Sequence, residues 1–328
     1  MGQIENRKKC RENAGRSAQG QNGHRAFTTI HRSLIATAFL FGCSSSAFHN
    51  VSDTLFDGEK AFALLKAQTD FGPRYSGTQA HIKMRDWLVS QAKQYTDKVS
   101  IQEFQHTWST NGKTLKMYNV IADMDFKAKK RILLVAHWDT RPTADQELDS
   151  AKRNKPILGA NDGASGVAVL LELMRAFREN PPPVNITFLF VDGEDLGPES
   201  NDMFLGAKYF AKTTNPRLYA YGILLDMIGD KNLRIPKESF SVYYASSLVE
   251  RFYAHAAKIG LGKYFPNASQ SWISDDHVPL NEAGIPTMDL IDFDYPYWHT
   301  LDDTPDKCSA DSLAVVGRAV ESFLRAEK

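Results

Sequence analysis

Cysteine is scarce in this chain, which contains only Cys10, Cys43 and Cys308 among 328 residues. Cys10 lies in a polar segment near the N-terminus and Cys43 directly follows a short apolar run, so Cys308 is the one cysteine in the rest of the sequence. A single thiol can form neither a disulfide nor a cluster of thiolate metal ligands within that part of the chain. Both kinds of cross-link are therefore excluded there.

Net charge is also absent, because 39 lysines and arginines balance 39 aspartates and glutamates. A neutral chain has no overall field that would steer it to nucleic acid, so we expect no nucleic-acid partner. Hydrophobic residues make up 42% and charged residues 24% of the sequence, as in ordinary soluble globular proteins. The length is sufficient for one large α/β domain or two smaller ones.

A long apolar run is missing as well. The clearest uncharged apolar segment, residues 33–41, is too short to cross a bilayer as a helix. Arg25, His31 and Arg32 precede it and small residues follow it, which is the pattern of a secretory signal. An apolar fragment of an N-terminal helix is the alternative interpretation.

The end of this run, Leu40-Phe41-Gly42-Cys43, resembles a bacterial lipoprotein cleavage box, in which the cysteine becomes the lipidated first residue. We therefore predict an exported protein, either periplasmic or anchored to a membrane by a lipid on Cys43. Residues 1–50 are assigned to this leader and signal or lipoprotein-type segment, and residues 51–328 to a catalytic domain.

The rest of the chain alternates between helical and strand patterns. Such alternation predicts a three-layer α/β/α domain with a mixed, mostly parallel central sheet. The expected helices are residues 61–67, 80–95, 165–178, 204–212, 247–259 and 309–326, and the expected strands are residues 100–108, 115–123, 131–137, 185–192, 220–226, 241–244 and 285–291.

Acidic and histidine side chains directly follow the most apolar of these strands. They are His137 and Asp139, then Glu194 and Asp195, then Asp226. Ligands of open α/β sheets bind at the carboxyl ends of the strands, so these side chains are expected to converge on one edge. Asp162 in the turn before a helix and His299 in the loop after the last strand are expected beside them.

Each of these residues also has a simpler interpretation. His137 could be structural, or a ligand that Asp139 orients. Asp162 could cap its helix, and Glu194-Asp195 could be a solvated loop pair. Two adjacent buried acids repel each other unless a cation lies between them, however, and carboxylates with imidazoles favour zinc or a similar divalent ion.

Six segments in this order resemble the zinc aminopeptidase-like hydrolases, and among these the glutaminyl-peptide cyclotransferases (glutaminyl cyclases) of bacterial type. The segments are Ala136-His-Trp-Asp-Thr140, Gly159-Ala-Asn-Asp-Gly-Ala-Ser-Gly166, Val191-Asp-Gly-Glu-Asp195, Leu225-Asp-Met-Ile-Gly229, Asp275-Asp-His277 and Tyr297-Trp-His-Thr300. The sequence departs from the animal cyclases at three places: residues 196–201 contain no tryptophan, Asp195 replaces a glutamate, and Asp289 replaces a histidine.

The resemblance implies specific roles at the matching positions. It makes Asp162, Asp195 and His299 the ligands of a single zinc ion. It makes Glu194 the general acid and base. It further implies that Asp226 and Asp275 are a hydrogen-bonded pair of catalytic acids and that Trp298 packs against the substrate.

The expected reaction is therefore conversion of the N-terminal glutamine of peptides or proteins to pyroglutamate with release of ammonia. A di-zinc aminopeptidase is the alternative, in which His137 and Asp226 would hold the second zinc and Asp162 would bridge the two ions. A catalytically inactive scaffold on the same fold is a third reading, since fold alone does not prove function. Zinc analysis distinguishes it from the two enzymes.

Overall fold

The computed structural model describes residues 54–328. The predicted signal segment and the lipid anchor at Cys43 lie outside the described residues. Within the described range, none of the helices combines the length and the apolar character that crossing a membrane requires.

Six strands form one sheet in the order β1-β2-β4-β3-β5-β6. β1 pairs with β2 and β2 with β4 in antiparallel fashion, whereas the pairs β4–β3, β3–β5 and β5–β6 are parallel. The predicted mixed, mostly parallel sheet is thus confirmed. The strands are β1 (Val99–Thr107), β2 (Thr114–Met124), β3 (Arg131–His137), β4 (Asn185–Val191), β5 (Tyr221–Asp226) and β6 (Thr287–Ile291).

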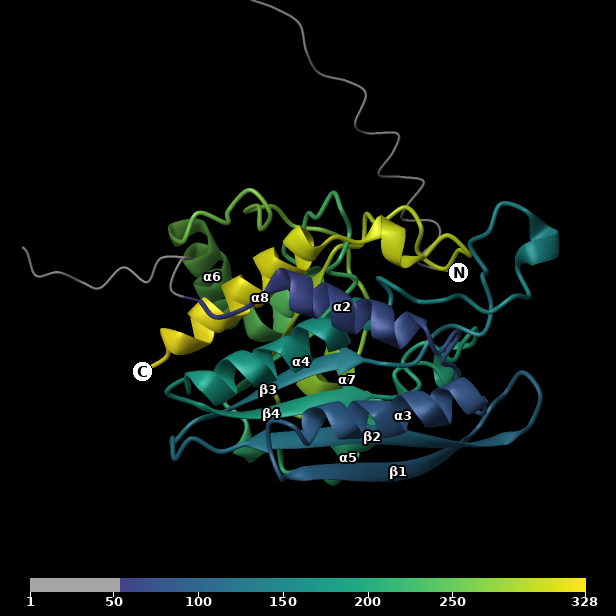
Figure 1. Ribbon diagram of the computed structural model, residues 1–328, viewed down its shortest axis with the longest axis horizontal. Coiled ribbons are helices and arrows are strands. Elements are labelled where there is room, and N and C mark those ends of the chain that lie inside the picture. The colour runs from purple at the N-terminus through teal and green to yellow at the C-terminus, as the bar shows by residue number, and fades with distance from the viewer. Residues whose placement is uncertain (1–53) are drawn as a thin grey trace, which may run out of the picture. The chain divides into compact units, whose positions relative to one another are not determined.

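Helices cover both faces of the sheet, because alternate residues of the buried strands point to opposite sides. Ile132 and Leu134 of β3 pack in the larger core with five helices, whereas Leu133 and Val135 pack in a second core with two. In Figure 1, α2, α4 and α8 lie side by side in the larger layer. The larger layer contains α2 (Gly58–Thr69), α3 (Gln79–Ala92), α4 (Ala164–Glu179), α6 (Ser239–Lys258) and α8 (Ala310–Arg325), and the smaller contains α5 (Leu205–Thr213) and α7 (His277–Glu282). Short 3-10 turns occur at Ser150–Lys152, Ser200–Asp202, Pro216–Leu218 and Pro305–Lys307.

The prediction of a strand at residues 241–244 is wrong, because these residues belong to the first turns of α6. Glu238 caps this helix by accepting hydrogen bonds from the backbone N–H groups of Phe240 and Ser241, and such a cap starts a helix whatever the strand preference of the next residues. The helix is kinked at Ala245, where φ is −132° and ψ is 35°. The kink lies between the residues predicted as a strand (241–244) and those predicted as a helix (247–259).

The turn that carries Asp162 depends on two glycines. Gly163 has φ of +97° and is the N-terminal cap of α4, with no side-chain capping bond, so Asp162 is not the capping residue. A Cβ atom on Gly166 would lie 2.2 Å from the carbonyl oxygen of Leu225 and 2.9 Å from Cβ of Ala136. The start of α4 therefore packs directly on β5 and β3, which brings Asp162 to the edge where these strands end.

Candidate metal centre and active site

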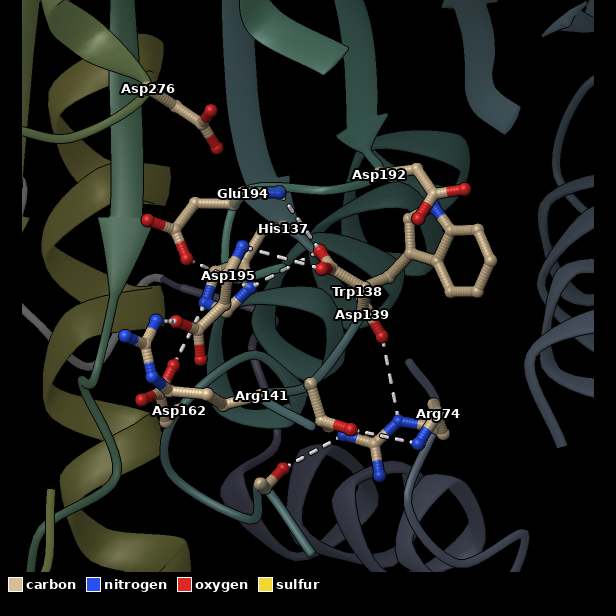
Figure 2. A network of polar contacts seen from close by, with 12 residues as sticks. Arg74, His137, Trp138, Asp139, Arg141, Asp162, Asp192, Glu194, Asp195 and Asp276 are labelled. Atoms are coloured by element: carbon tan, nitrogen blue, oxygen red, sulfur yellow. Dashed lines mark hydrogen bonds and ion pairs between the residues drawn. The ribbon is translucent and has the colours of Figure 1, made fainter. Parts of the chain in front are cut away.

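The acidic and histidine residues predicted from the sequence do gather at the carboxyl ends of the parallel strands (Figure 2). His137 ends β3, Glu194 and Asp195 lie in the turn after β4, and Asp226 ends β5. Asp162 comes from the start of α4, and His299 from the loop after β6. All are buried, with residue exposures between 1% and 8%.

Asp162, Asp195 and His299 form the first candidate metal group. Their ligand atoms all lie within 4.8 Å of one another. His299 Nε2 lies 3.3 Å from Asp195 Oδ1 and 3.5 Å from Asp162 Oδ2. The Oδ2 atoms of both aspartates are buried and lack a hydrogen-bond partner among the described residues. Two carboxylates and one imidazole with free ligand atoms fit a zinc ion and leave a position for substrate.

Without metal, the two buried carboxylates of this group lie close together, and their charges change the pKa values of Asp162 and His299. Burial, and then the charge of Asp195, raise the pKa of Asp162. Burial alone would lower the pKa of His299, but the charge of Asp195 and the hydrogen bonds to Asp145 and Asp195 together outweigh it, and the pKa rises to about 9. A proton on His299 therefore partly does what a cation would do, and zinc binding would displace that proton.

His137, Asp162 and Asp226 form a second candidate group that shares Asp162 with the first. His137 Nε2 lies 3.1 Å from Asp226 Oδ1 and 3.2 Å from Asp162 Oδ1. Its other ring nitrogen, Nδ1, has no hydrogen-bond partner among the described residues. Asp139 Oδ1 lies 3.7 Å away, beyond hydrogen-bond distance, so the expectation that Asp139 orients the imidazole through a hydrogen bond does not hold.

Arg141 and Asp145 support the first group, and the sequence analysis missed both. Arg141 Nη1 donates to Asp195 Oδ1 at 2.5 Å, and its Nη2 donates to Asp145 Oδ2 at 2.8 Å. Asp145 Oδ1 lies 3.0 Å from His299 Nδ1. The two side chains thus connect two ligands of the candidate site. Their spacing of four residues directly after the His137 motif was the available signal.

Replacing Asp145 by alanine is expected to weaken zinc binding about 10- to 100-fold, because the partner that fixes the His299 ring is lost. The dissociation constant, measured by competition with a chromophoric chelator, checks this. Asp149→Asn is the matched control, since Asp149 is an exposed acid on the same loop. An unchanged zinc affinity in a folded Asp145→Ala protein would contradict the supporting role.

Two buried aspartates hold the backbone of the segments that carry the site. Asp139 accepts hydrogen bonds from the backbone N–H groups of Glu194 at 3.2 Å and Asp195 at 3.3 Å, as Figure 2 shows for Glu194. Asp303 accepts from the N–H groups of Asn161 at 2.8 Å and Asp162 at 3.1 Å. These acids fix the backbone of the segments that carry Asp162, Glu194 and Asp195.

The remaining acids lie next to the metal groups. Burial, and then the charge of Asp195, raise the pKa of Glu194 well above its usual value. Burial and the charge of Asp226 do the same for Asp275, and burial and the charge of Asp275 raise the pKa of Asp289. Oδ1 of Asp275 accepts from the backbone N–H of Asp276 at 2.6 Å, and Oδ2 has no hydrogen-bond partner among the described residues, so the expected hydrogen bond between Asp226 and Asp275 is not formed.

Trp298 and Asp276 complete the surroundings. The Trp298 ring stacks on His299 with centroids 3.9 Å apart and an interplanar angle of 26°. Asp276 is fully buried, and burial raises its pKa to about 8. It follows Asp275 directly and precedes α7, a short helix that contains Pro279 and was not predicted. The structure thus brings together every site residue that the sequence analysis named.

The three layers and the buried carboxylate–imidazole groups at the strand ends define a metalloenzyme of the zinc aminopeptidase-like class. Residues 119–324 match the model of Peptidase family M28. Because this match covers more than half of the chain, the chain belongs to that family, and the predicted superfamily is confirmed. Zinc is the metal that this family membership and the donor set imply together.

Solved structures and a curated relative show the same relationship. The glutaminyl cyclase of Bacteroides thetaiotaomicron, in complex with N-acetylhistamine, is 36% identical with a TM-score of 0.80, over 83% of this chain and 99% of that one. A zinc-dependent exopeptidase from Parabacteroides distasonis is 35% identical with a TM-score of 0.80, over the same shares. The glutaminyl-peptide cyclotransferase of Drosophila melanogaster is 26% identical over 283 residues, 75% of each chain.

Proposed function

We propose that this protein is a glutaminyl-peptide cyclotransferase, which converts the N-terminal glutamine of peptides or proteins to pyroglutamate and releases ammonia. The observation that carries the proposal is that the buried acids Glu194, Asp226 and Asp275 lie beside the candidate zinc ligands. Asp226 and Asp275 can hold the substrate's reacting nitrogen atoms by hydrogen bonds while Glu194 moves the proton. The similarity to the glutaminyl cyclases named above supports it.

One zinc ion is proposed, held by Asp162, Asp195 and His299. A histidine that binds metal almost always donates its other ring N–H to a carboxylate or carbonyl. His299 has such a partner in Asp145, whereas Nδ1 of His137 has none among the described residues. Zinc bound there would supply a Lewis acid that polarises the side-chain amide of glutamine.

The side chains of this protein would then orient the substrate for a ring closure within the substrate molecule itself. The α-amine of the substrate forms the new N–C bond with the side-chain carbonyl carbon, so orientation provides much of the acceleration. Glu194 takes one proton from this amine and returns it to the departing amide nitrogen, which leaves as ammonia. Asp226 and Asp275 hold the substrate, and Trp298 packs against its glutamine side chain.

A di-zinc aminopeptidase is the second candidate, and the shared Asp162 is the observation that favours it. Its two oxygens face the two candidate groups separately, with Oδ1 near His137 and Oδ2 near His299. This geometry would let Asp162 bridge two ions. Glu194 would then accept the proton of a water molecule that attacks the peptide bond.

Mass spectrometry of two peptides distinguishes these functions. With zinc-loaded protein, we expect a peptide that begins with glutamine to lose ammonia faster than a no-enzyme control, and a peptide that begins with leucine to stay intact. Release of free leucine would contradict the cyclase and establish the aminopeptidase. No change in either peptide, with zinc present, would contradict both and leave a scaffold function.

A further inference from the structure

Four aromatic side chains gather at the start of α6 and on the segment before Asp275: Phe240, Tyr243, Tyr244 and Trp272, named here the aromatic platform. Tyr243 is 70%, Trp272 54% and Tyr244 36% exposed. The rings of Phe240 and Trp272 lie 4.8 Å apart, and those of Tyr243 and Tyr244 4.9 Å apart. Among residues 54–328, seven large hydrophobic side chains are exposed, and the three aromatic ones all belong to this platform. Grouped exposure of this kind marks a binding surface, unlike single exposed residues.

One buried carboxylate connects the aromatic platform to the catalytic segment. Glu238 Oε1 accepts hydrogen bonds from the backbone N–H of Phe240 at 2.7 Å and of Ile273 at 3.0 Å. Its Oε2 lies 3.1 Å from Nε2 of His277. His277 is two residues after Asp275, so both halves of the platform are held to the segment that carries this acid.

Apolar contacts continue from the platform to the metal group. Ile273, the neighbour of Trp272, belongs to a buried cluster with Tyr295, and Phe293 and Trp298 pack against that cluster. Trp298 in turn stacks on His299. Because α6 follows β5, its first turns lie near the edge where the parallel strands end, which is the edge of the active site.

The proposed reaction defines what can reach this surface. The metal group is buried and would take the N-terminal glutamine, so the following residues of a peptide must leave along the rim of the site. An extended chain rises about 3.3 Å per residue, so two or three residues reach about 10 Å from the glutamine. Aromatic rings offer a large contact area at low cost in side-chain entropy, and they pack well with other apolar side chains.

We propose that the aromatic platform binds the side chains of the residues that follow the N-terminal glutamine and selects peptides with apolar or aromatic residues there. This inference rests on the proposed cyclase function. It makes Trp272 and Tyr243 specificity residues that lie outside the catalytic centre.

The test compares kcat and KM for Gln-Phe-Phe-amide, Gln-Ser-Ser-amide and Gln-Gly-amide in the wild type, Trp272→Ala and Tyr243→Ala. For Gln-Phe-Phe-amide, each substitution is expected to raise KM about three- to tenfold, the range of one aromatic contact, with kcat unchanged. For Gln-Gly-amide, which has no side chain beyond the glutamine, kcat/KM should change less than twofold. Leu218→Ala, a substitution of an exposed apolar residue outside the platform, should affect no substrate.

An equal loss for all three peptides, or none, would overturn the platform while the cyclase function stands. Binding of Gln-Phe-Phe-amide to the zinc-loaded Glu194→Gln protein, measured by calorimetry, tests the platform without turnover. Weaker binding after Trp272→Ala would support it even if no peptide is cyclised, which would refute only the proposed function. A wild-type dimer that dissociates in Trp272→Ala, with unchanged peptide affinity, would assign the surface to a second copy instead.

Discussion

Replacing Glu194 by glutamine is expected to lower kcat about 10²- to 10⁴-fold while zinc stays bound. The amide cannot accept the proton that the substrate amine must lose. It has nearly the same shape as a protonated glutamate, however, and burial and the charge of Asp195 already raise the pKa of Glu194 well above its usual value. The substitution should therefore disturb neither the fold nor the three ligands.

Turnover of a glutamine peptide and zinc content, measured on the same preparation, check this result. Glu199→Gln is the matched control, because Glu199 is an exposed glutamate on the same loop. Undiminished turnover would remove Glu194 from the role of proton carrier. Loss of zinc would show that Glu194 acts as a ligand.

Replacing His299 by alanine is expected to reduce zinc affinity by roughly two powers of ten or more. Structural zinc sites with four protein ligands bind with roughly 10–16 kcal/mol, so one ligand contributes about 3 kcal/mol. The backbone of His299 has φ of +55°, a conformation that residues with a Cβ seldom adopt. The chain accepts this backbone geometry at the position that directs Nε2 toward Asp162 and Asp195.

Zinc retained after dialysis, determined by elemental analysis, measures this loss. His255→Ala is the control, since His255 is a half-buried histidine on α6 whose Nε2 bonds Ser322 and not the metal group. Equal zinc content in both variants would exclude His299 from the ligand set. A protein without zinc is also expected to lose cyclisation, because the Lewis acid that would polarise the amide is then missing.

The sequence predicted which acidic and histidine residues gather at one edge of the sheet, because these residues stand at positions that the fold determines. The apolar runs of β3, β4 and β5 identify buried parallel strands, and polar residues at their carboxyl ends must share one edge. His137, Glu194 and Asp226 follow directly from this rule. The alternation of helices and strands predicted the three layers in the same way.

The supporting residues could not be found by such a rule. Arg141, Asp145 and Asp303 lie in loops, where a charged residue is most often a solvated surface group. Their importance depends on tertiary contacts, such as the bonds from Asp303 to the backbone 141 and 142 residues earlier.

The error at residues 241–244 has a different cause. Val242, Tyr243 and Tyr244 have the β-branched and aromatic side chains that favour strands. The cap at Glu238 and the packing of α6 on β6 outweigh this local preference. Tyr243 and Tyr244 are instead exposed on a helix, where their rings belong to the aromatic platform.

Three buried acids, Asp139, Asp303 and Glu238, hold the backbone of segments that carry functional residues. This arrangement has a consequence for deciding which members of an enzyme family are pseudoenzymes. A family member can keep each residue that touches metal or substrate and still be inactive, if one of these three backbone-holding acids has been replaced. Comparison of family members should therefore include all three positions, because they record whether the catalytic geometry is still under selection.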